Sequence, residues 1–234
     1  MKKWSVKLKG EEYQLDYLVN KVNSPNLSLI KEDGCYYLEF SDLKNAKNQD
    51  EARLIASEFV NNINRILRVD LGLSNIRIDE IICEENGKSI NSMSATLLCT
   101  VSIIPSKPNV EFSMNYGNIL KCIKNDKKVE DALIFYFLEV NWHNLFKVWE
   151  TIESDVNYKD IIKNGWASKR EIDLFRCSAH NREASGYHAR HAVPKMNKHC
   201  KEILSTSKPM KLGNANKLIR EILISWINSK NVQN

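Results

Sequence analysis

The sequence has little of the residues that interrupt regular structure: its 234 residues include only 8 glycines and 5 prolines. Long disordered or low-complexity tracts are therefore not expected. It also lacks any apolar run approaching the roughly 18–20 residues that cross a bilayer, and the opening MKKWSVKLKG has no apolar signal core. We therefore expect a cytoplasmic protein without a membrane-spanning segment.

No CxxC pair occurs among the six cysteines, which are widely spaced: Cys35, Cys83, Cys99, Cys122, Cys177 and Cys200. Paired cysteines are typical of structural zinc sites, and disulfides are typical of exported proteins. In a cytoplasmic protein these thiols are expected to be reduced and mostly buried. Nothing in the sequence calls for a cofactor.

Charge of one sign is not in large excess. The 34 Lys and Arg residues against 29 Asp and Glu residues give a formal net charge of +5, which permits a polyanionic partner such as RNA without requiring one. Because the lysines are spread along the chain, they are expected to form a solvated surface. A hydrophobic content of 43% is ordinary for a globular protein, and this length can bury one large core or two smaller ones.

The first hundred residues carry the patterns of an α+β unit. Strands are predicted from alternating or β-rich apolar runs over 4–8, 27–30, 35–40, 76–83 and 95–104. Turn signals at Asp33-Gly34 and Asn86-Gly87 indicate that the sheet is antiparallel. Helices are predicted over 12–22 and from Gln49 to about Leu67, where apolar residues recur every three or four positions.

Two prolines within four residues, Pro105 and Pro108, stop regular structure and mark a domain boundary near 105–115. The sequence therefore predicts an α+β domain over 1–110 and a helical bundle over 111–234. Helical periodicity in the second domain predicts helices over 118–124, 129–152 and 215–226.

The side chains best suited to chemistry gather between Arg176 and His191. Four of the five histidines lie in or just after this stretch, together with three arginines: His180, His188, His191, His199, Arg176, Arg182 and Arg190. Ser168 and Glu171 have the spacing of a capping box that starts the helix leading into it. Ser185-Gly186 is expected to end this helix, and a second helical piece is predicted over 187–193.

Three interpretations of the stretch remain open. Histidine and arginine can act on a phosphodiester without a metal, the first by moving protons and the second by stabilising charge on phosphoryl oxygens. Cys177-x2-His180 followed by His188-x2-His191 has the rhythm of zinc ligands, with His199 and Cys200 nearby; because the pairs are so close together, we expect no zinc. Polar residues at a helix break also serve as scaffold or docking surface.

A resemblance is carried by several segments of the C-terminal half: 141–150, Gly165-Trp166-Ala167, 175–181, 185–191, Lys208-Pro209-Met210 and the final helix with Trp226. On these residues the chain resembles a bacterial family of largely uncharacterised proteins. More remotely, the helical half resembles HEPN domains, which are small and often dimeric helical bundles. HEPN domains occur in antiphage and toxin–antitoxin ribonucleases and in non-catalytic relatives.

The HEPN resemblance implies a metal-independent ribonuclease motif, in which an arginine and a polar residue precede a histidine by a few positions. Arg182 and His188 match its spacing, with Glu183 where Asn, Asp or His is usual. The implied function is a bacterial defence-associated ribonuclease. The ribose 2′-hydroxyl would attack the adjacent phosphate, so DNA would be resistant.

The expected catalytic set is Arg182, His188, Arg190 and His191, and the expected binding set is Arg176, His180 and Asn181. The alternative is a non-enzymatic sensor or adaptor whose Arg/His surface docks a partner protein, a nucleotide or a nucleic acid. Under either interpretation we expect a homodimer or a subunit of a larger complex.

Overall fold

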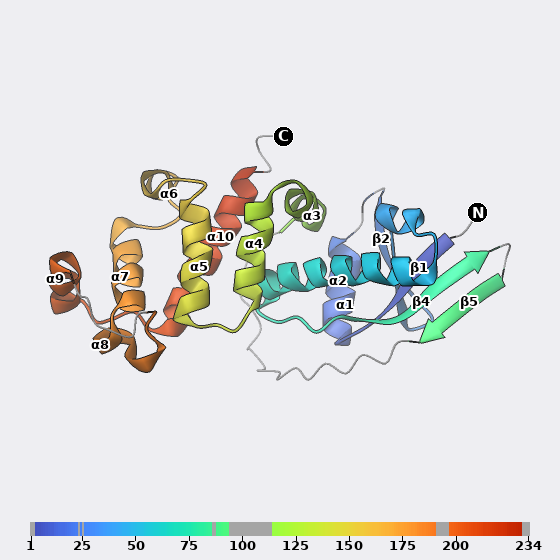
Figure 1. Cartoon of the computed structure of the whole chain (residues 1–234), viewed down its shortest axis with the longest axis horizontal. Helices are drawn as coiled ribbons and strands as arrows, with labels where there is room; N and C mark the ends of the chain where they lie inside the picture. Colours follow the sequence, from blue (N-terminus) through green and yellow to red (C-terminus); the bar gives the residue numbers. More distant parts are fainter. Residues whose placement is uncertain are drawn as a thin grey trace. The chain divides into compact units, whose positions relative to one another are not determined.

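The computed structural model describes residues 3–22, 24, 26–85, 88–93, 114–190 and 197–230 (Figure 1). Side chains are not described for residues 85, 88–93, 183, 184 and 188. The chain separates into two compact units, Met1–Lys121 and Cys122–Asn234. The boundary predicted over 105–115 lies almost entirely outside the described residues, so it stays a prediction. None of the helices in the described ranges is long and apolar enough to cross a membrane.

The N-terminal unit contains a sheet in which neighbouring strands are all antiparallel, in the order β2-β3-β1-β4-β5. The strands are β1 (Lys3–Lys9), β2 (Leu27–Glu32), β3 (Cys35–Phe40), β4 (Arg77–Glu85) and β5 (Lys88–Met93). This confirms the antiparallel sheet of an α+β protein. The strand predicted over 95–104 and the turn at 86–87 lie outside the described residues, and β5 is the strand that pairs with β4.

The turn between β2 and β3 lies where the sequence predicts it. Asp33 and Gly34 both take positive φ angles, 48° and 76°, as a two-residue turn matching the twist of the strands requires. The alternation in β1 buries Trp4, Val6 and Leu8. The apolar face of the sheet is thus fixed by the two-residue period of its strands.

Two helices accompany the sheet: α1 (Glu12–Lys21) and α2 (Gln49–Leu71), with a short 3-10 helix, η1 (Ser41–Asn45), before α2. Asn48 caps α2 by accepting from the Glu51 N–H, and Gly72 ends it in the left-handed conformation. Buried Asp70 of α2 accepts hydrogen bonds from the Tyr17 hydroxyl at 2.6 Å and from the Tyr116 hydroxyl at 3.0 Å. Burial and this carboxylate raise the pKa of both tyrosines, which therefore remain donors at neutral pH.

The C-terminal unit is helical. Its elements are α4 (Lys127–Phe137), α5 (Trp142–Glu153), α6 (Tyr158–Lys163), α7 (Lys169–His180), α8 (Arg182–Ser185), η2 (Gly186–His188), α9 (Lys198–Thr206) and α10 (Leu212–Lys230); α3 (Tyr116–Asn125) crosses the division between the units. Helix α5 packs against α4, α7 and α10. Trp149, Phe175 and Trp226 are fully buried in this core.

The single helix predicted over 129–152 is wrong: the structure has two helices, α4 and α5, that pack side by side. Asn141 starts α5 by accepting from the Asn144 N–H at 2.8 Å, and the Asn144 side chain donates to the Glu139 carbonyl at 2.9 Å. These hydrogen bonds hold the short connection between α4 and α5. Each helix buries one apolar face, and the two faces together give the several apolar stripes in the sequence that suggested one central helix.

Candidate functional site

Helix α7 leads into the Arg/His stretch and begins as predicted. The Glu171 N–H donates to Ser168 Oγ, and the Ser168 N–H donates to Glu171 Oε2, which completes the capping box. The Ser168 hydroxyl also donates to Glu171 Oε2, at 2.6 Å, and this bond together with that from the Ser168 N–H lowers the pKa of Glu171. Ile172, Phe175 and Ala179 are buried, as their spacing predicts.

The predicted break at Ser185-Gly186 is present. The chain leaves α7 at Asn181, forms the single turn α8, and changes at Gly186, whose φ is 62°, into the 3-10 turn η2. The Ser185 hydroxyl donates to the carbonyl of Ser178, so the broken end folds back onto α7. Residues 191–196 lie outside the described residues, and with them His191 and the end of the helical piece predicted over 187–193.

Arg190 contacts both α7 and α5. Its backbone N–H donates to the Ala179 carbonyl at 2.8 Å. Its guanidinium lies 3.0 Å from Glu150 Oε1 and 4.3 Å above the centre of the Phe146 ring. A cation held by a carboxylate and stacked on an aromatic face is positioned by its surroundings. Arg190 therefore ties the stretch to α5.

Arg182 and Tyr187 face solvent. The Arg182 guanidinium lies 4.7 Å from the centre of the Tyr187 ring, and 90% of Tyr187 is exposed. His188 is the last residue of η2, but its side chain lies outside the described part of the structure. The stretch thus presents an arginine and an aromatic ring together at the surface.

The three residues predicted for binding have different surroundings. Arg176 is 3.7 Å from Glu153 of α5, and its side chain is partly exposed. The His180 ring meets the edge of the Phe146 ring at 4.4 Å between centroids, and Asn181 is buried. Phe146 of α5 therefore brings His180 and Arg190 together, whereas Arg176 lies over a different acidic residue of the same helix.

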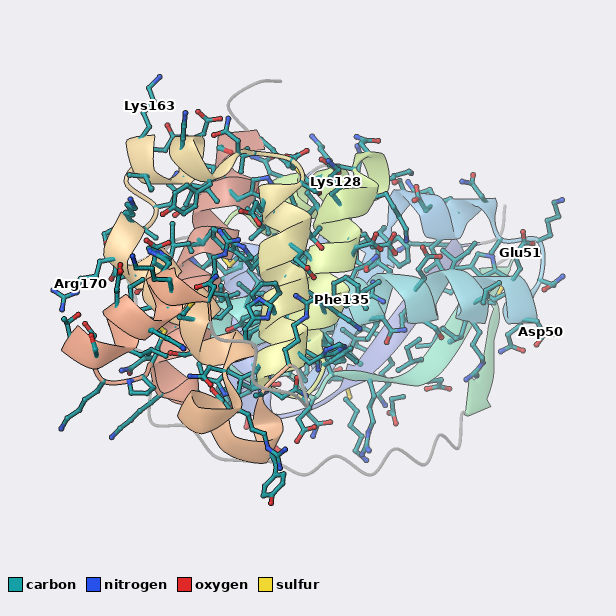
Figure 2. All side chains as sticks on the ribbon, turned by 60° about the vertical axis from the view of Figure 1, so that its left-hand side comes forward. Asp50, Glu51, Lys128, Phe135, Lys163 and Arg170 are labelled. Atoms are coloured by element: carbon teal, nitrogen blue, oxygen red, sulfur yellow. A yellow bond between two sulfur atoms is a disulfide. The ribbon has the colours of Figure 1, made fainter. Side chains whose placement is uncertain are left out.

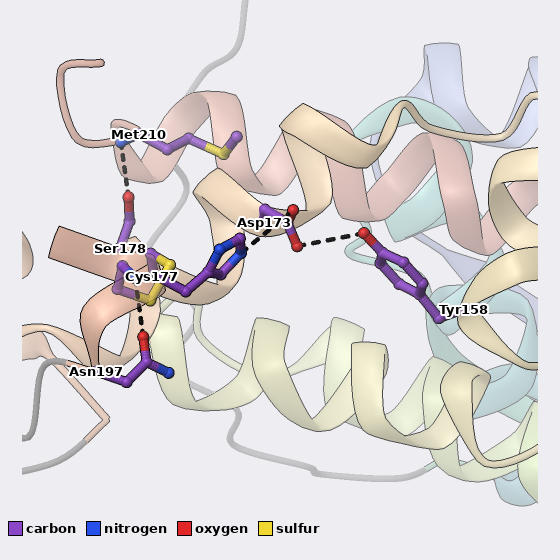
Figure 3. The surroundings of a disulfide bond; sticks show 8 residues. Tyr158, Asp173, Cys177, Ser178, Asn197 and Met210 are labelled. Carbon is purple, nitrogen blue, oxygen red and sulfur yellow. Dashed lines mark hydrogen bonds and ion pairs between the residues drawn. A yellow bond between two sulfur atoms is a disulfide. The ribbon is translucent and has the colours of Figure 1, made fainter. Parts of the chain in front are cut away.

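A disulfide joins Cys177 of α7 to Cys200 of α9, with 5.3 Å between the Cα atoms (Figure 3). The expectation that all thiols are reduced is therefore wrong for this pair. The two cysteines are 23 positions apart in the sequence. The pairing could not be predicted from that separation, because it depends on the packing of α9 against α7. Helix α9 starts at the cap residue Asn197 and has no buried side chain.

The other cysteines agree with the expectation where they are described. Cys83 and Cys122 are buried free thiols, Cys35 is a partly exposed one, and Cys99 lies outside the described residues. Burial raises the pKa of the Cys122 thiol, so it is not a reactive thiolate.

Asp173 links three helices beside the disulfide (Figure 3). It accepts a hydrogen bond from the Tyr158 hydroxyl of α6 at 3.2 Å and pairs with His199 Nε2 of α9 at 3.5 Å. Burial and the carboxylate of Asp173 raise the pKa of Tyr158. His199, which lies near the predicted zinc-ligand pattern in the sequence, thus contacts a carboxylate that also accepts a hydrogen bond from Tyr158.

Where side chains are described, no group of three His, Cys, Asp or Glu residues is close enough to hold a metal ion. The sulfurs of Cys177 and Cys200 are bonded to one another and offer no thiolate to a metal. The second pair of candidate zinc ligands comprises His188 and His191, whose side chains are not described.

Sequence reasoning missed how unevenly the charge is distributed. Between Lys163 and Arg220 the sequence has 13 Lys and Arg residues against 4 Asp and Glu residues, an excess larger than the +5 of the whole chain. Arg170 and Lys163 point away from the ribbon in Figure 2. A local count of charge would have found this signal, which the averaged net charge conceals.

Comparison of the chain with protein-family models, curated proteins and solved structures gives no match.

Proposed function

We propose that this protein binds RNA through its C-terminal helical unit, in a bacterial defence or toxin system. The observation that carries the proposal is the exposed pair of Tyr187 and Arg182 in the unit that holds the excess of positive charge. Single-stranded RNA is held by stacking of its bases on aromatic rings and arginine planes and by contacts of its phosphates with basic residues. Both kinds of contact are available here.

Within this proposal Arg182 and His188 are the pair that would cleave the bound RNA, as in HEPN-like domains. The ribose 2′-hydroxyl loses its proton to a base and its oxygen forms a bond to the adjacent phosphorus. The bond from phosphorus to the 5′-oxygen breaks, and that oxygen gains a proton. His188 is suited to move one of these protons and Arg182 to stabilise the charge on the phosphoryl oxygens.

Arg190 is assigned a different role. Its guanidinium contacts Glu150 and Phe146, so Arg190 is a positioning residue that holds the stretch on α5. His180, which contacts the Phe146 ring, has the same role.

The binding proposal is tested with a labelled single-stranded RNA. Tyr187→Ala and Arg182→Ala should each weaken binding by about tenfold or more, because stacking of one base contributes roughly 1–3 kcal/mol. Tyr13→Ala is the matched control, because Tyr13 is also exposed but belongs to the N-terminal unit. Equal affinity of the Tyr187→Ala variant and the wild type for RNA would contradict the proposal.

The same RNA distinguishes cleavage from binding alone. A nuclease should leave a cyclic 2′,3′-phosphate end on RNA and leave DNA of the same sequence intact, and His188→Ala should slow cleavage by about 10²–10⁴-fold. The second candidate is the non-enzymatic adaptor, favoured by the engagement of Arg190, Arg176 and His180 with α5. RNA that is bound by the wild type and recovered uncut would support the adaptor.

A further inference from the structure

The segment Lys208-Pro209-Met210, which the proposed function does not use, lines a hollow in the C-terminal unit. The hollow has a volume of about 650 Å³ and lies between α7, residues 208–211 and the first turns of α10. Its apolar lining includes Leu174 and Leu218. This volume is within the range of sites for small ligands, roughly 300–1,000 Å³.

The segment is anchored at both ends. The Arg170 guanidinium donates to Ser207 Oγ at 3.0 Å. The Met210 N–H donates to the hydroxyl of buried Ser178 at 2.9 Å (Figure 3). The Lys211 carbonyl accepts from the Ala215 N–H and so begins α10. Lys208 and Lys211 therefore project from a fixed backbone.

The charges that line the hollow do not balance. It is lined by Lys208, Lys211 and Lys217 and by two glutamates. Lys217 is 4.0 Å from Glu221, and the carboxylate of the second glutamate, Glu171, accepts hydrogen bonds from Ser168 in the capping box. Where the structure is described, neither Lys208 nor Lys211 forms an ion pair with a carboxylate, and three lysines against two glutamates leave the lining with a net charge of +1.

We propose that this hollow, the Lys208–Lys211 hollow, is a binding site for a phosphate group. Lysine ammonium groups bind phosphate as point charges, and the start of α10 beside Lys211 adds partial positive charge. The phosphate is that of the RNA backbone, a choice of source that rests on the proposed function. Bound RNA is then held by its bases at Tyr187 and by its backbone at the hollow.

The test is the salt dependence of RNA binding by the Lys208→Gln/Lys211→Gln variant. On a single strand each phosphate contact contributes about 0.7 to the slope of log K against log salt concentration, so the slope should fall by about 1.4. The matched control is Lys159→Gln/Lys163→Gln, which removes the same charge from α6 of the same unit; both control lysines are exposed, and Lys163 points outward in Figure 2. Because all four lysines are exposed, neither variant should change the melting temperature.

Equal slopes for the two variants would overturn the site, since the effect would then follow net charge alone. The proposed function would survive that result if RNA binding still required Tyr187. Binding of inorganic tripolyphosphate, measured by calorimetry, tests the phosphate site without RNA. If the wild type binds it but not RNA, and the Lys208→Gln/Lys211→Gln variant loses it, the phosphate site stands and RNA binding fails. Binding of neither probe would overturn both proposals.

Discussion

Truncating Arg190 to alanine should destabilise the protein more than the position of Arg190 in an exposed stretch suggests. Only 24% of its side chain is exposed, and it contacts both Glu150 and the Phe146 ring. Because Glu150 is 46% exposed, solvent screens the ion pair and its contribution is small, but the lost contact with Phe146 adds to it. We expect Arg190→Ala to cost about 1–2 kcal/mol and to lower the melting temperature by roughly 2–8 °C, measured by circular dichroism.

Arg182→Ala is the matched arginine for this comparison, because Arg182 is stacked on a ring that is itself exposed. Its melting temperature should stay within about 1 °C of the wild type. An Arg190→Ala variant that melts with the wild type but loses RNA cleavage would place Arg190 back in the catalytic set, where the sequence put it.

Sequence reasoning could locate this stretch but could not separate the roles of its residues. The density of histidine and arginine and the glycine at 186 are local properties, so the stretch and its break could be predicted. The partners of Arg190 and His180 lie on α5, 34 to 44 positions earlier in the chain. No local pattern reports such a contact, so a structural arginine and a solvent-facing one looked alike.

At the scale of elements, α9 depends on few contacts. It has no buried side chain, and it is joined to α7 by the disulfide, by His199 with Asp173 and by Arg170 with Ser207 at its end. A disulfide contributes typically about 2–4 kcal/mol, which is large for a helix of this length. We therefore expect a thiol reductant to increase amide hydrogen exchange in 198–206 far more than in α5 or α10.

The Cys177→Ser/Cys200→Ser variant supplies the control for that measurement. Its α9 should exchange rapidly from the start, and the reductant should change nothing further. Because α9 adds no side chain to the buried core, the melting temperature of the unit should move by only a few degrees. Slow exchange in α9 after complete reduction would show that noncovalent contacts suffice to hold it.

Elements with strong local signals were predictable, and elements defined by packing were not. The hairpin at Asp33-Gly34, the capping box at Ser168 and the glycine end of α2 are each specified within a few residues. The division of α4 from α5 depends on asparagines that resemble ordinary exposed helix positions until their hydrogen bonds are seen. The pairing of α7 with α9, and so the disulfide, depends entirely on tertiary packing.

At the scale of the whole molecule, the two units should respond separately to a protease. The change from strand to helix periodicity and the prolines at 105 and 108 predict that limited proteolysis cuts first near 105–115. Mass spectrometry of the first fragments checks this. A first cut within α5 or α10, whose apolar faces are buried, would contradict the two-domain interpretation.

The bond between Cys177 and Cys200 also makes the Arg/His stretch part of a covalent ring. The predicted catalytic residues of the stretch and its exposed tyrosine lie between the two cysteines: Arg182, His188, Arg190, His191 and Tyr187. One peptide bond cut inside this ring opens it without releasing a fragment. A nicked molecule therefore migrates as an intact chain on a denaturing gel until a reductant is added. Preparations of this protein judged intact without reductant can already be cleaved through the stretch proposed to contact RNA.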